Sequence, residues 1–333
     1  MLKTFKKQSN SNYILHKGIV IKSTGSWYQV RLENDKVLQC RIIGKFRLNG
    51  QKVTNPVAVG DEVMVELEGE DNGTIKEILP RRNCVVRQSP RKKHHLHIMA
   101  SNIDQAVLIM TIINPNLKQG FIDRFLIMTE AYDIPVSIVF NKSDTYGEEE
   151  LAVYELLKDI YEKIGYQIFL VSALEGKGID PLKALLKDKT SLISGQSGVG
   201  KSTLINAIES SLDIRTEEIS DYSGKGTHTT TFAQMYPLSN GGRIIDTPGI
   251  KLLSFNNLEV MDVAHNFREF FKASKNCKFA NCMHRNEPGC AVKEGIESEE
   301  ISDLRYINYI QMIEEIEDQN YWERHQMLSL IHI

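Results

Sequence analysis

Apolar and polar residues alternate in short runs between residues 13 and 80. The runs read GIVIKS, WYQVRLE, VLQCRIIG, DEVMVELE and GTIKEIL, with Gly, Asn and Pro between them. A period of two is typical of strands that bury one face. Five such strands without a comparable helical pattern predict a small β-barrel over residues 1–82. The five-stranded oligonucleotide-binding (OB) barrel is the natural candidate, although an SH3-like barrel would give a similar pattern.

The next segment, RRNCVVRQSPRKKHHLHIMASNID, is basic and rich in His. Pro90 interrupts it, and we interpret residues 83–103 as a basic linker or mobile loop between domains. Its side chains could bind a phosphate backbone, could bind a metal through the His residues, or could simply be solvated. The candidates are Arg91, Lys92, Lys93, His94 and His95.

From residue 104 onward, apolar strands alternate with amphipathic helices. The expected strands are AVLIMTI, IPVSIVF, YQIFLVSA, TSLIS, AQMYPL and GRII; the expected helices are FIDRFLIMTEAYD, EELAVYELLKDIYEKIG, GIDPLKALLKDK and KSTLINAIE. This alternation predicts a mainly parallel sheet covered on both faces, which we assign to residues 104–255. Residues 256–333 are helical and acidic around a Cys/His cluster, and the terminal MLSLIHI fits neither the preceding polar helix nor a cap.

Length and composition add two constraints. A chain of 333 residues has room for two or three domains of about 150 residues. No apolar run reaches the roughly 20 residues that span a bilayer, and no secretory signal is visible, so we expect a soluble cytoplasmic protein without a membrane partner.

Charge is distributed unevenly along the chain. Residues 1–100 carry 18 Lys and Arg against 9 Asp and Glu, a net charge of +9, and the remainder carries −12. A basic end on an acidic body suggests an anionic partner such as RNA. Two differently charged domains without a shared partner would give the same asymmetry. Trp27, Tyr28 and Phe46 could stack on bases, although aromatic residues in barrels are more often core.

The segment GQSGVGKS, residues 195–202, follows an expected strand and opens an expected helix. This is the pattern and the context of a phosphate-binding loop (P-loop). Glycines let backbone N–H groups surround phosphates at the positive end of a helix. Lys201 is then expected to reach the β and γ phosphates, and Ser202 to ligate Mg²⁺.

Two further segments suit a sensor of the γ-phosphate. DTPG follows the strand GRII, so that Asp246 could hold Mg²⁺ through water and Gly249 could offer its N–H to the phosphate. GKGTHTTT, residues 224–231, lies between the P-loop and DTPG. Thr229 or Thr230 could complete the Mg²⁺ shell in the GTP state, and the pattern does not separate the two. A Thr-rich loop without a role is the alternative.

NKSD, residues 141–144, follows the strand IPVSIVF. The Asp144 carboxylate can accept two hydrogen bonds from N1–H and the 2-amino group of guanine, which adenine does not offer, so it would select GTP over ATP. Asn141 would tie the loop, the Lys142 stem would stack on the base, and the backbone of VSA at 171–173 could meet the guanine O6. A strand-end turn rich in Asn and Asp is the alternative for NKSD alone, and a P-loop ATPase or nucleotide kinase is the alternative for the whole set.

Cys277, Cys282, His284 and Cys290 are spaced x4, x1 and x5. Three thiolates and one imidazole form a closed tetrahedral Zn²⁺ set with no open position for a substrate. We therefore predict one structural zinc ion that stabilises a small subdomain. Unrelated buried Cys residues and a surface His are the alternative.

The order of the motifs, with the base loop before the P-loop, is a circular permutation of the small-GTPase order. NKSD, VSA, GQSGVGKSTL, HTTT, DTPG and CKFANCMHRNEPGCAV together resemble the RsgA (YjeQ) family of circularly permuted GTPases over nearly the whole chain. The resemblance implies an OB barrel, a permuted α/β P-loop GTPase domain and a C-terminal helical zinc domain. The nucleotide residues it implies are Asn141, Lys142, Asp144, Ser172, Ala173, Gly195, Gln196, Ser197, Gly198, Val199, Gly200, Lys201, Ser202, Thr203, Thr229, Thr230, Asp246 and Gly249.

The family resemblance also implies a function. It predicts a late maturation factor of the bacterial small ribosomal subunit that binds the subunit and its rRNA with GTP bound, is stimulated by it, and is released on hydrolysis to GDP. We expect a monomer. The alternative is a GTP-gated RNA-binding module with incidental hydrolysis.

The groups that carry out hydrolysis are less clearly marked. Ile250 follows DTPG, where many GTPases carry a water-positioning Gln, so intrinsic turnover should be slow. His228 is the nearest polar candidate for ordering the attacking water, and it could equally be a surface contact. DTPG runs through IKLLSFNN into the zinc domain, which suggests that hydrolysis reorients that domain relative to the barrel.

Overall fold

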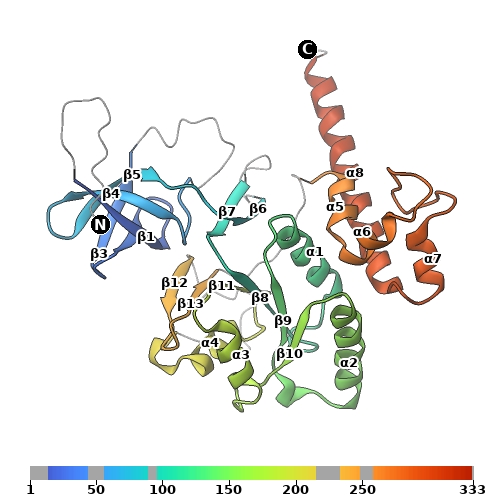
Figure 1. The fold of residues 1–333 in the computed structure, drawn as a ribbon, viewed down its shortest axis with the longest axis horizontal. Helices are drawn as coiled ribbons and strands as arrows, with labels where there is room; N and C mark the ends of the chain where they lie inside the picture. Colours follow the sequence, from blue (N-terminus) through green and yellow to red (C-terminus); the bar gives the residue numbers. More distant parts are fainter. Residues whose placement is uncertain (1–13, 44–55, 89–95, 215–232, 248–257, 332–333) are drawn as a thin grey trace.

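The computed structural model describes residues 14–43, 56–88, 96–214, 233–247 and 258–331 (Figure 1). Within these ranges the chain forms a barrel, a two-stranded hairpin, an α/β sheet and a helical C-terminal part. The candidates Phe46, Arg91, Lys92, Lys93, His94, His95, His228, Thr229, Thr230, Gly249 and Ile250 lie outside the described residues.

The N-terminal barrel has the five strands that alternation predicted. They are β1 (Leu15–Ser23), β2 (Tyr28–Leu32), β3 (Val37–Ile42), β4 (Glu62–Glu68) and β5 (Asn72–Ile78). The pairing order is β1-β2-β3-β5-β4, and β4 returns to β1, so the sheet closes on itself and leaves no free edge. Its core includes Val30, Leu38 and Tyr28, which is only 1% exposed. Tyr28 is therefore a core residue, whereas Trp27 is 39% exposed with the Arg41 guanidinium 3.9 Å from its ring centroid.

Both described ends of residues 83–103 form strands, where the sequence had suggested a linker or mobile loop. β6 (Cys84–Gln88) and β7 (Leu96–Ser101) pair as an antiparallel two-stranded sheet. Val85 and Ala100 are fully buried, and Val86 and Ile98 pack with Ala58 next to the barrel. The apolar triplets CVV and IMA supply enough buried surface to order both ends of the segment, although the residues between them are strongly basic.

In the α/β part, the described residues form six strands and four α-helices. They are β8 (Gln105–Met110), α1 (Gln119–Glu130), β9 (Val136–Phe140), α2 (Glu148–Lys163), β10 (Gln167–Leu170), α3 (Ile179–Leu186), β11 (Thr190–Gly195), α4 (Lys201–Ile208), β12 (Gln234–Pro237) and β13 (Arg243–Asp246). The strand order is β10-β9-β8-β11-β13-β12, and every pair is parallel except β12–β13.

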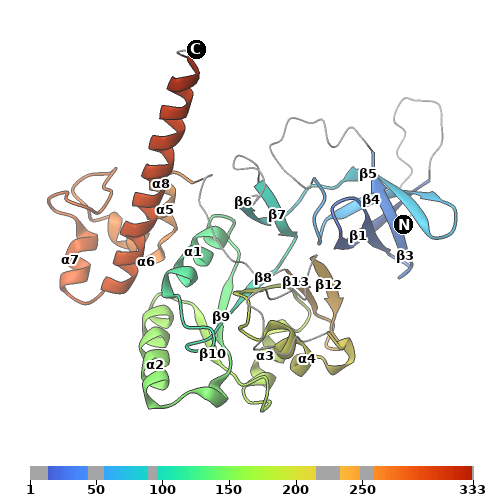
Figure 2. The ribbon, with the colours of Figure 1, turned by 180° about the vertical axis from the view of Figure 1, so that it is seen from behind.

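Helices cover both faces of this sheet (Figures 1 and 2). All six residues of β8 are buried, and successive side chains point to opposite faces. Leu108 and Met110 pack with α1 and α2, while Val107 and Ile109 pack with α3 and α4. Strands buried on both sides explain why these segments read as continuous apolar runs rather than alternating ones.

The barrel is joined to the α/β sheet by strand pairing as well as by the chain. Lys22 in β1 pairs with Gln234 in β12, so the described strands of both parts form a single eleven-stranded sheet. Gly60 reinforces the junction, because its N–H donates to Val20 O at 2.9 Å and the Asn102 side chain donates to its carbonyl at 3.0 Å.

The C-terminal part consists of four helices beside α1. They are α5 (Val260–Asn266), α6 (Arg268–Ser274), α7 (Ala291–Glu297) and α8 (Asp303–Ile331). α8 continues through Ile331, so most of the terminal MLSLIHI is helical, contrary to expectation. Among the described residues, no helix is both long and apolar enough to span a bilayer.

A buried polar cluster fastens this helical part to the α/β sheet. Arg305 on α8 is 2% exposed and pairs with Asp123 on α1 and with Glu269 on α6. Tyr161 on α2 donates to Asp123 at 2.8 Å, and Asn308 on α8 donates to the same carboxylate at 2.5 Å. Burial raises the pKa of Asp123, and the Arg305 charge opposes this shift.

Candidate guanine-nucleotide site and metal centre

The base loop and the phosphate loops follow the carboxyl ends of neighbouring parallel strands. NKSD follows β9, VSA follows β10, the P-loop follows β11, and DTPG begins at the last residue of β13. Because these strands are parallel and lie in the order β10-β9-β8-β11-β13, the described starts of all four loops lie at one edge of the sheet. Ligands of open α/β sheets bind at this edge. The inverted chain order thus leaves the spatial arrangement of a GTPase intact.

Gly200 and Asn141 show how closely the two principal loops pack. Gly200 caps the start of α4 with φ +87, a conformation that favours glycine. A Cβ atom at Gly200 would lie 2.6 Å from Asn141 Nδ2. The P-loop therefore lies directly on the base loop, and a larger residue at Gly200 would push the two apart.

Asn141 joins three of the loops. It is 1% exposed, its Nδ2 donates to Val199 O at 2.9 Å, and its Oδ1 accepts from the Ala173 N–H at 3.1 Å. The first bond reaches the P-loop and the second reaches VSA. Through these two bonds Asn141 ties the base loop to the P-loop and to VSA.

The other base-loop residues lie beside it. Ser172 Oγ donates to Asp144 Oδ1 at 2.5 Å, which orients the carboxylate expected to read guanine. Lys142 adopts a left-handed φ of +66, and its Nζ donates to Asn114 O at 2.5 Å. Burial lowers the pKa of Lys142, and the Asp144 charge works in the opposite direction.

The P-loop lysine lies against its own loop. Lys201 Nζ donates to Gln196 O at 2.9 Å and to Gly195 O at 3.3 Å. Burial lowers the pKa of Lys201, and the nearby Asp246, which is 1% exposed, acts to raise it. A half-desolvated ammonium gains from an anion placed beside it, which suits binding of phosphate. Ser202 lies in the first turn of α4, and Asp246 ends β13.

Sequence reasoning missed the segment that follows β8. This strand lies between β9 and β11, so its end also faces the nucleotide loops. The Asn114 carbonyl accepts a hydrogen bond from the Lys142 ammonium, and Thr111 Oγ1 donates to Pro115 O at 2.7 Å. Tyr146, after NKSD, also contacts this segment. The signal available in the sequence was that TIINPN, residues 111–116, follows a buried parallel strand.

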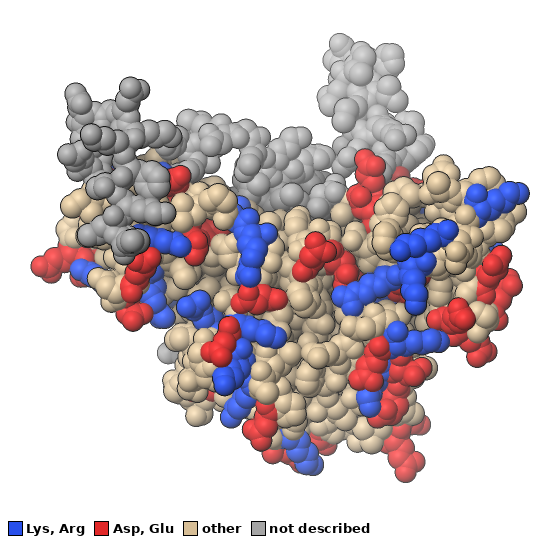
Figure 3. All heavy atoms as spheres, in the orientation of Figure 1, with Lys and Arg blue, Asp and Glu red and all other residues tan. Residues whose placement is uncertain are grey.

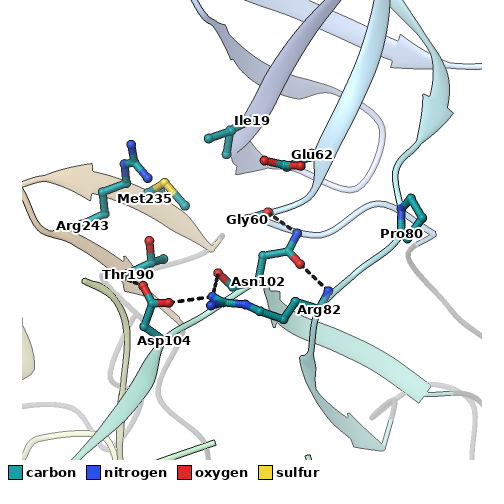
Figure 4. Close-up of a pocket in the computed structure, with 10 residues that line it drawn as sticks. All are labelled: Ile19, Gly60, Glu62, Pro80, Arg82, Asn102, Asp104, Thr190, Met235 and Arg243. Atoms are coloured by element: carbon teal, nitrogen blue, oxygen red, sulfur yellow. Dashed lines mark hydrogen bonds and ion pairs between the residues drawn. The ribbon is translucent and has the colours of Figure 1, made fainter. Parts of the chain in front are cut away.

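A cavity of about 370 Å³ lies away from these loops (Figure 4). It opens at the amino end of the parallel strands, between the sheet, the hairpin and the barrel. Arg82 donates to Asp104 Oδ1 at 2.7 Å within it, so its charges are largely balanced internally. Because it lies at the amino end of the parallel strands, the cavity is separate from the nucleotide site at their carboxyl end. Its lining residues are Ile19, Gly60, Glu62, Pro80, Arg82, Asn102, Asp104, Thr190, Met235 and Arg243.

The four predicted zinc ligands lie together. The ligand atoms of Cys277, Cys282, His284 and Cys290 are all within 4.8 Å of one another, and the last three residues are buried. Cys290 Sγ is 3.5 Å from His284 Nδ1. Burial raises the pKa of Cys282 to about 12, so a bound cation is needed to hold it as a thiolate. The donor set and its spacing fit Zn²⁺.

Neighbouring groups hold the ligand loop in shape. Tyr306 on α8 donates to the carbonyl of His284 at 2.8 Å, and Tyr309 donates to that of Met283 at 2.7 Å. Glu287 accepts from the backbone N–H groups of Met283 and Arg285 at 2.7 and 2.8 Å. Because α8 also carries Arg305, the same helix supports the loop of the Cys/His cluster and contacts α1.

The closed barrel, the permuted order of the loops and their convergence at one edge define a circularly permuted P-loop GTPase. Family models agree: one described as RsgA GTPase matches residues 78–256, and one described as RsgA N-terminal domain matches residues 17–75. The chain belongs to the RsgA family of GTPases, as its motifs predicted.

Individual relatives match over nearly the whole chain. It is 49% identical over 305 residues to "Small ribosomal subunit biogenesis GTPase RsgA" of Bacteroides fragilis (strain YCH46), covering 92% of this chain and 98% of that one. The protein of the same name from Christiangramia forsetii is 50% identical over 304 residues, covering 90% of this chain and 96% of that one.

Two solved structures resemble the fold. The crystal structure of YjeQ from Thermotoga maritima aligns with a TM-score of 0.72 at 34% identity and covers 91% of this chain and 98% of that one. The structure of YloQ, described as a circularly permuted GTPase, aligns with a TM-score of 0.69 at 30% identity and covers 94% and 99%.

Proposed function

We propose that this GTPase acts in a late step of small ribosomal subunit maturation, binding the subunit and its rRNA in the GTP state and leaving after hydrolysis. The relatives named above are described as small ribosomal subunit biogenesis GTPases. The observation that carries the GTP-dependent part of the proposal is the bonding of Asn141, which ties the base loop to the P-loop and to VSA. A factor of this kind works in the cytoplasm, and we propose that it does so as a monomer.

The proposed guanine contacts are Asp144 for the base edge, the Lys142 stem for the base face, and the backbone of Ser172 and Ala173 for O6. The phosphates would be bound by the P-loop, residues 195–203, with Lys201 supplying positive charge, and by the N–H of Gly249. Mg²⁺, when bound, neutralises developing charge on the phosphates. Ser202 and either Thr229 or Thr230 would ligate it directly, and Asp246 would hold it through water.

His228 is the proposed group that orders the attacking water. Ile250 cannot do so, which supports slow turnover until a partner positions the His228 loop. The zinc ion proposed at Cys277, Cys282, His284 and Cys290 is structural, because the donor set is complete without water. We divide the chain into residues 1–82, 104–255 and 256–333, with the hairpin segment between the first two.

The proposed RNA contact rests on the barrel and the charge of the first 100 residues. The barrel exposes Trp27 next to Arg41, a pair suited to stacking on a base. On the face shown in Figure 3, basic and acidic side chains are interspersed over the described residues. The described residues therefore form no uniform basic patch on that face, and binding there would need stacking as well as charge.

The test is GTP turnover by the purified protein with and without isolated small subunits, across a salt series. Stimulation that fades as salt rises supports an RNA-activated GTPase, because phosphate contacts release counterions. His228→Ala should then remove most of the stimulation while leaving GTP binding intact.

The absence of Gln at position 250 favours a second candidate, a GTP-gated RNA-binding module with incidental hydrolysis. Tight GTP-dependent subunit binding without stimulated turnover would select it. A protein that neither binds the subunit nor is stimulated by it would contradict both candidates.

A further inference from the structure

Tyr146 links the ends of two neighbouring strands at the nucleotide edge. It follows the short turn Ser143–Thr145, which carries Asp144. Its hydroxyl donates to Asn141 O at 2.7 Å and accepts from the Ile112 N–H at 3.0 Å. The first partner lies just after β9 and the second just after β8. The half-buried Tyr146 hydroxyl therefore donates one hydrogen bond to the loop after β9 and accepts one from the loop after β8.

The orientation of the Asn141 carbonyl affects the placement of several loops in this site. The ladder between β8 and β9 pairs residues only as far as Phe140, so the Asn141 carbonyl lies beyond it. The side chain of the same residue is bonded to both the P-loop and VSA. A rotation of the peptide after Asn141 would therefore disturb three loops. It would also move Lys142, whose left-handed backbone starts the turn that presents Asp144.

The protonation state of the hydroxyl suits this arrangement. Burial, with a smaller contribution from the Asp144 charge, raises the pKa of Tyr146 to about 12, while the bond from Ile112 acts against the shift. The group is thus a hydroxyl at neutral pH and keeps its proton for the Asn141 carbonyl. A second bond, from Lys142 to Asn114, ties the same two loops.

We infer that Tyr146 is a positioning residue for guanine recognition, which fixes the Asn141 peptide and thereby the placement of Asp144. The inference rests on the proposed guanine site. Tyr146 itself is not expected to contact the nucleotide.

Tyr146→Phe tests the inference, because it keeps the ring and removes both hydrogen bonds. The affinity for GTP and for GDP should fall equally, by about tenfold, since two buried polar groups lose their partner. In steady-state kinetics the loss should appear in KM rather than in kcat, because the base is bound alike in the ground and transition states. Both dissociation constants are measured by titration with fluorescent GDP and competition with GTP.

Tyr166→Phe is the matched control. Its hydroxyl donates to Glu130 Oε1 at 2.8 Å, before the start of β10 and so at the opposite end of the sheet. We expect unchanged nucleotide affinity for this variant, even if its melting temperature falls. Affinities within twofold of wild type in Tyr146→Phe, or equal losses in both Phe variants, would overturn the inference.

Asp144→Ala separates failure of the inference from failure of the proposed site. A large loss of GTP affinity in Asp144→Ala, together with the tenfold loss in Tyr146→Phe, supports both. A large loss in Asp144→Ala alone removes only the role of Tyr146. Unchanged GTP affinity in Asp144→Ala would show that guanine binds elsewhere, and the inference would fall with the site.

Discussion

At the scale of single residues, the side chain of Asn141 connects three loops of the proposed nucleotide site through one amide group. The residue is 1% exposed, and its amide satisfies the carbonyl of Val199 and the N–H of Ala173. We predict that Asn141→Ala lowers affinity for both GTP and GDP by about a hundredfold, because both partners are left unsatisfied. The measurement is equilibrium titration with labelled nucleotide.

Asn240→Ala provides the comparison for that variant. Its amide also bonds a backbone carbonyl, that of Lys183 at 2.8 Å, but this bond is exposed to solvent. Nucleotide affinity should therefore stay within twofold of wild type. Similar losses in both variants would mean that Asn141 acts through general stability rather than through its loops.

The Cys/His cluster leads to a second prediction at the residue scale. Cys290→Ser should reduce bound zinc from about one ion per chain to nearly none, because three ligands cannot close the tetrahedral set. Metal content after dialysis, measured by atomic emission, checks this. Cys84→Ser, a half-buried Cys outside the cluster, should keep its zinc. A wild-type protein that holds no zinc after purification in zinc-containing medium would contradict the assignment.

Motifs revealed residues whose chemistry is tied to a fixed spacing. The four Cys and His residues that cluster in the structure, and the proposed nucleotide residues Asn141, Asp144 and Lys201, could be chosen from the sequence. Metal and phosphate binding require particular side chains at particular distances along the chain. Tyr146 and Asn114 could not be identified in this way. Their roles depend on β8 and β9 being neighbours, and a Tyr hydroxyl or a backbone carbonyl has no spacing pattern of its own.

At the scale of secondary-structure elements, the contact of α8 with α1 has the most to lose from one substitution. Arg305→Met would leave Asp123 buried, 0% exposed, without its cation. We predict a cost of about 3–5 kcal/mol in the free energy of unfolding. Urea unfolding followed by tyrosine fluorescence measures it.

A partly exposed ion pair between the same helices calibrates that loss. Arg124 pairs with Glu315, and their side chains are 23% and 33% exposed. Arg124→Ala should cost about 1 kcal/mol or less, since water compensates the remaining charge. Adding Asp123→Leu to Arg305→Met should recover part of the larger loss. No recovery in the double variant would show that the helix contact depends on packing rather than on the buried charge.

The elements themselves were largely predictable from their patterns. Barrel strands that bury one face alternate apolar and polar residues, whereas sheet strands covered on both faces are apolar throughout. The two parts therefore have different sequence patterns. The hairpin β6–β7 was missed because its apolar stretches are about three residues long and surround a run of cations. Short strands gain their stability from tertiary contacts, here with Ala58 and Tyr132, which local sequence does not reveal.

At the scale of the whole molecule, two of the connections between the GTPase domain and the C-terminal helical part, which carries the proposed zinc site, bear on coupling. One is the chain that follows DTPG. The other is the buried contact of Arg305 and Asn308 with Asp123 on α1, a helix that starts after the β8 segment bonded to Lys142. If hydrolysis moves the zinc domain relative to the barrel, the chain connection must transmit the change at DTPG, while the α1 contact supplies a fixed pivot.

This arrangement predicts the effect of loosening only the chain connection. A flexible Gly/Ser insertion after Phe255 should leave the zinc domain on α1 and leave subunit-stimulated turnover near wild type. Release from the subunit after hydrolysis should become slower, because the change at DTPG no longer pulls on the zinc domain. The same insertion after Glu300, between α7 and α8, should leave release unchanged. Release measured by light scattering after a GTP pulse decides the matter: wild-type kinetics in the Phe255 variant would assign coupling to the α1 contact instead.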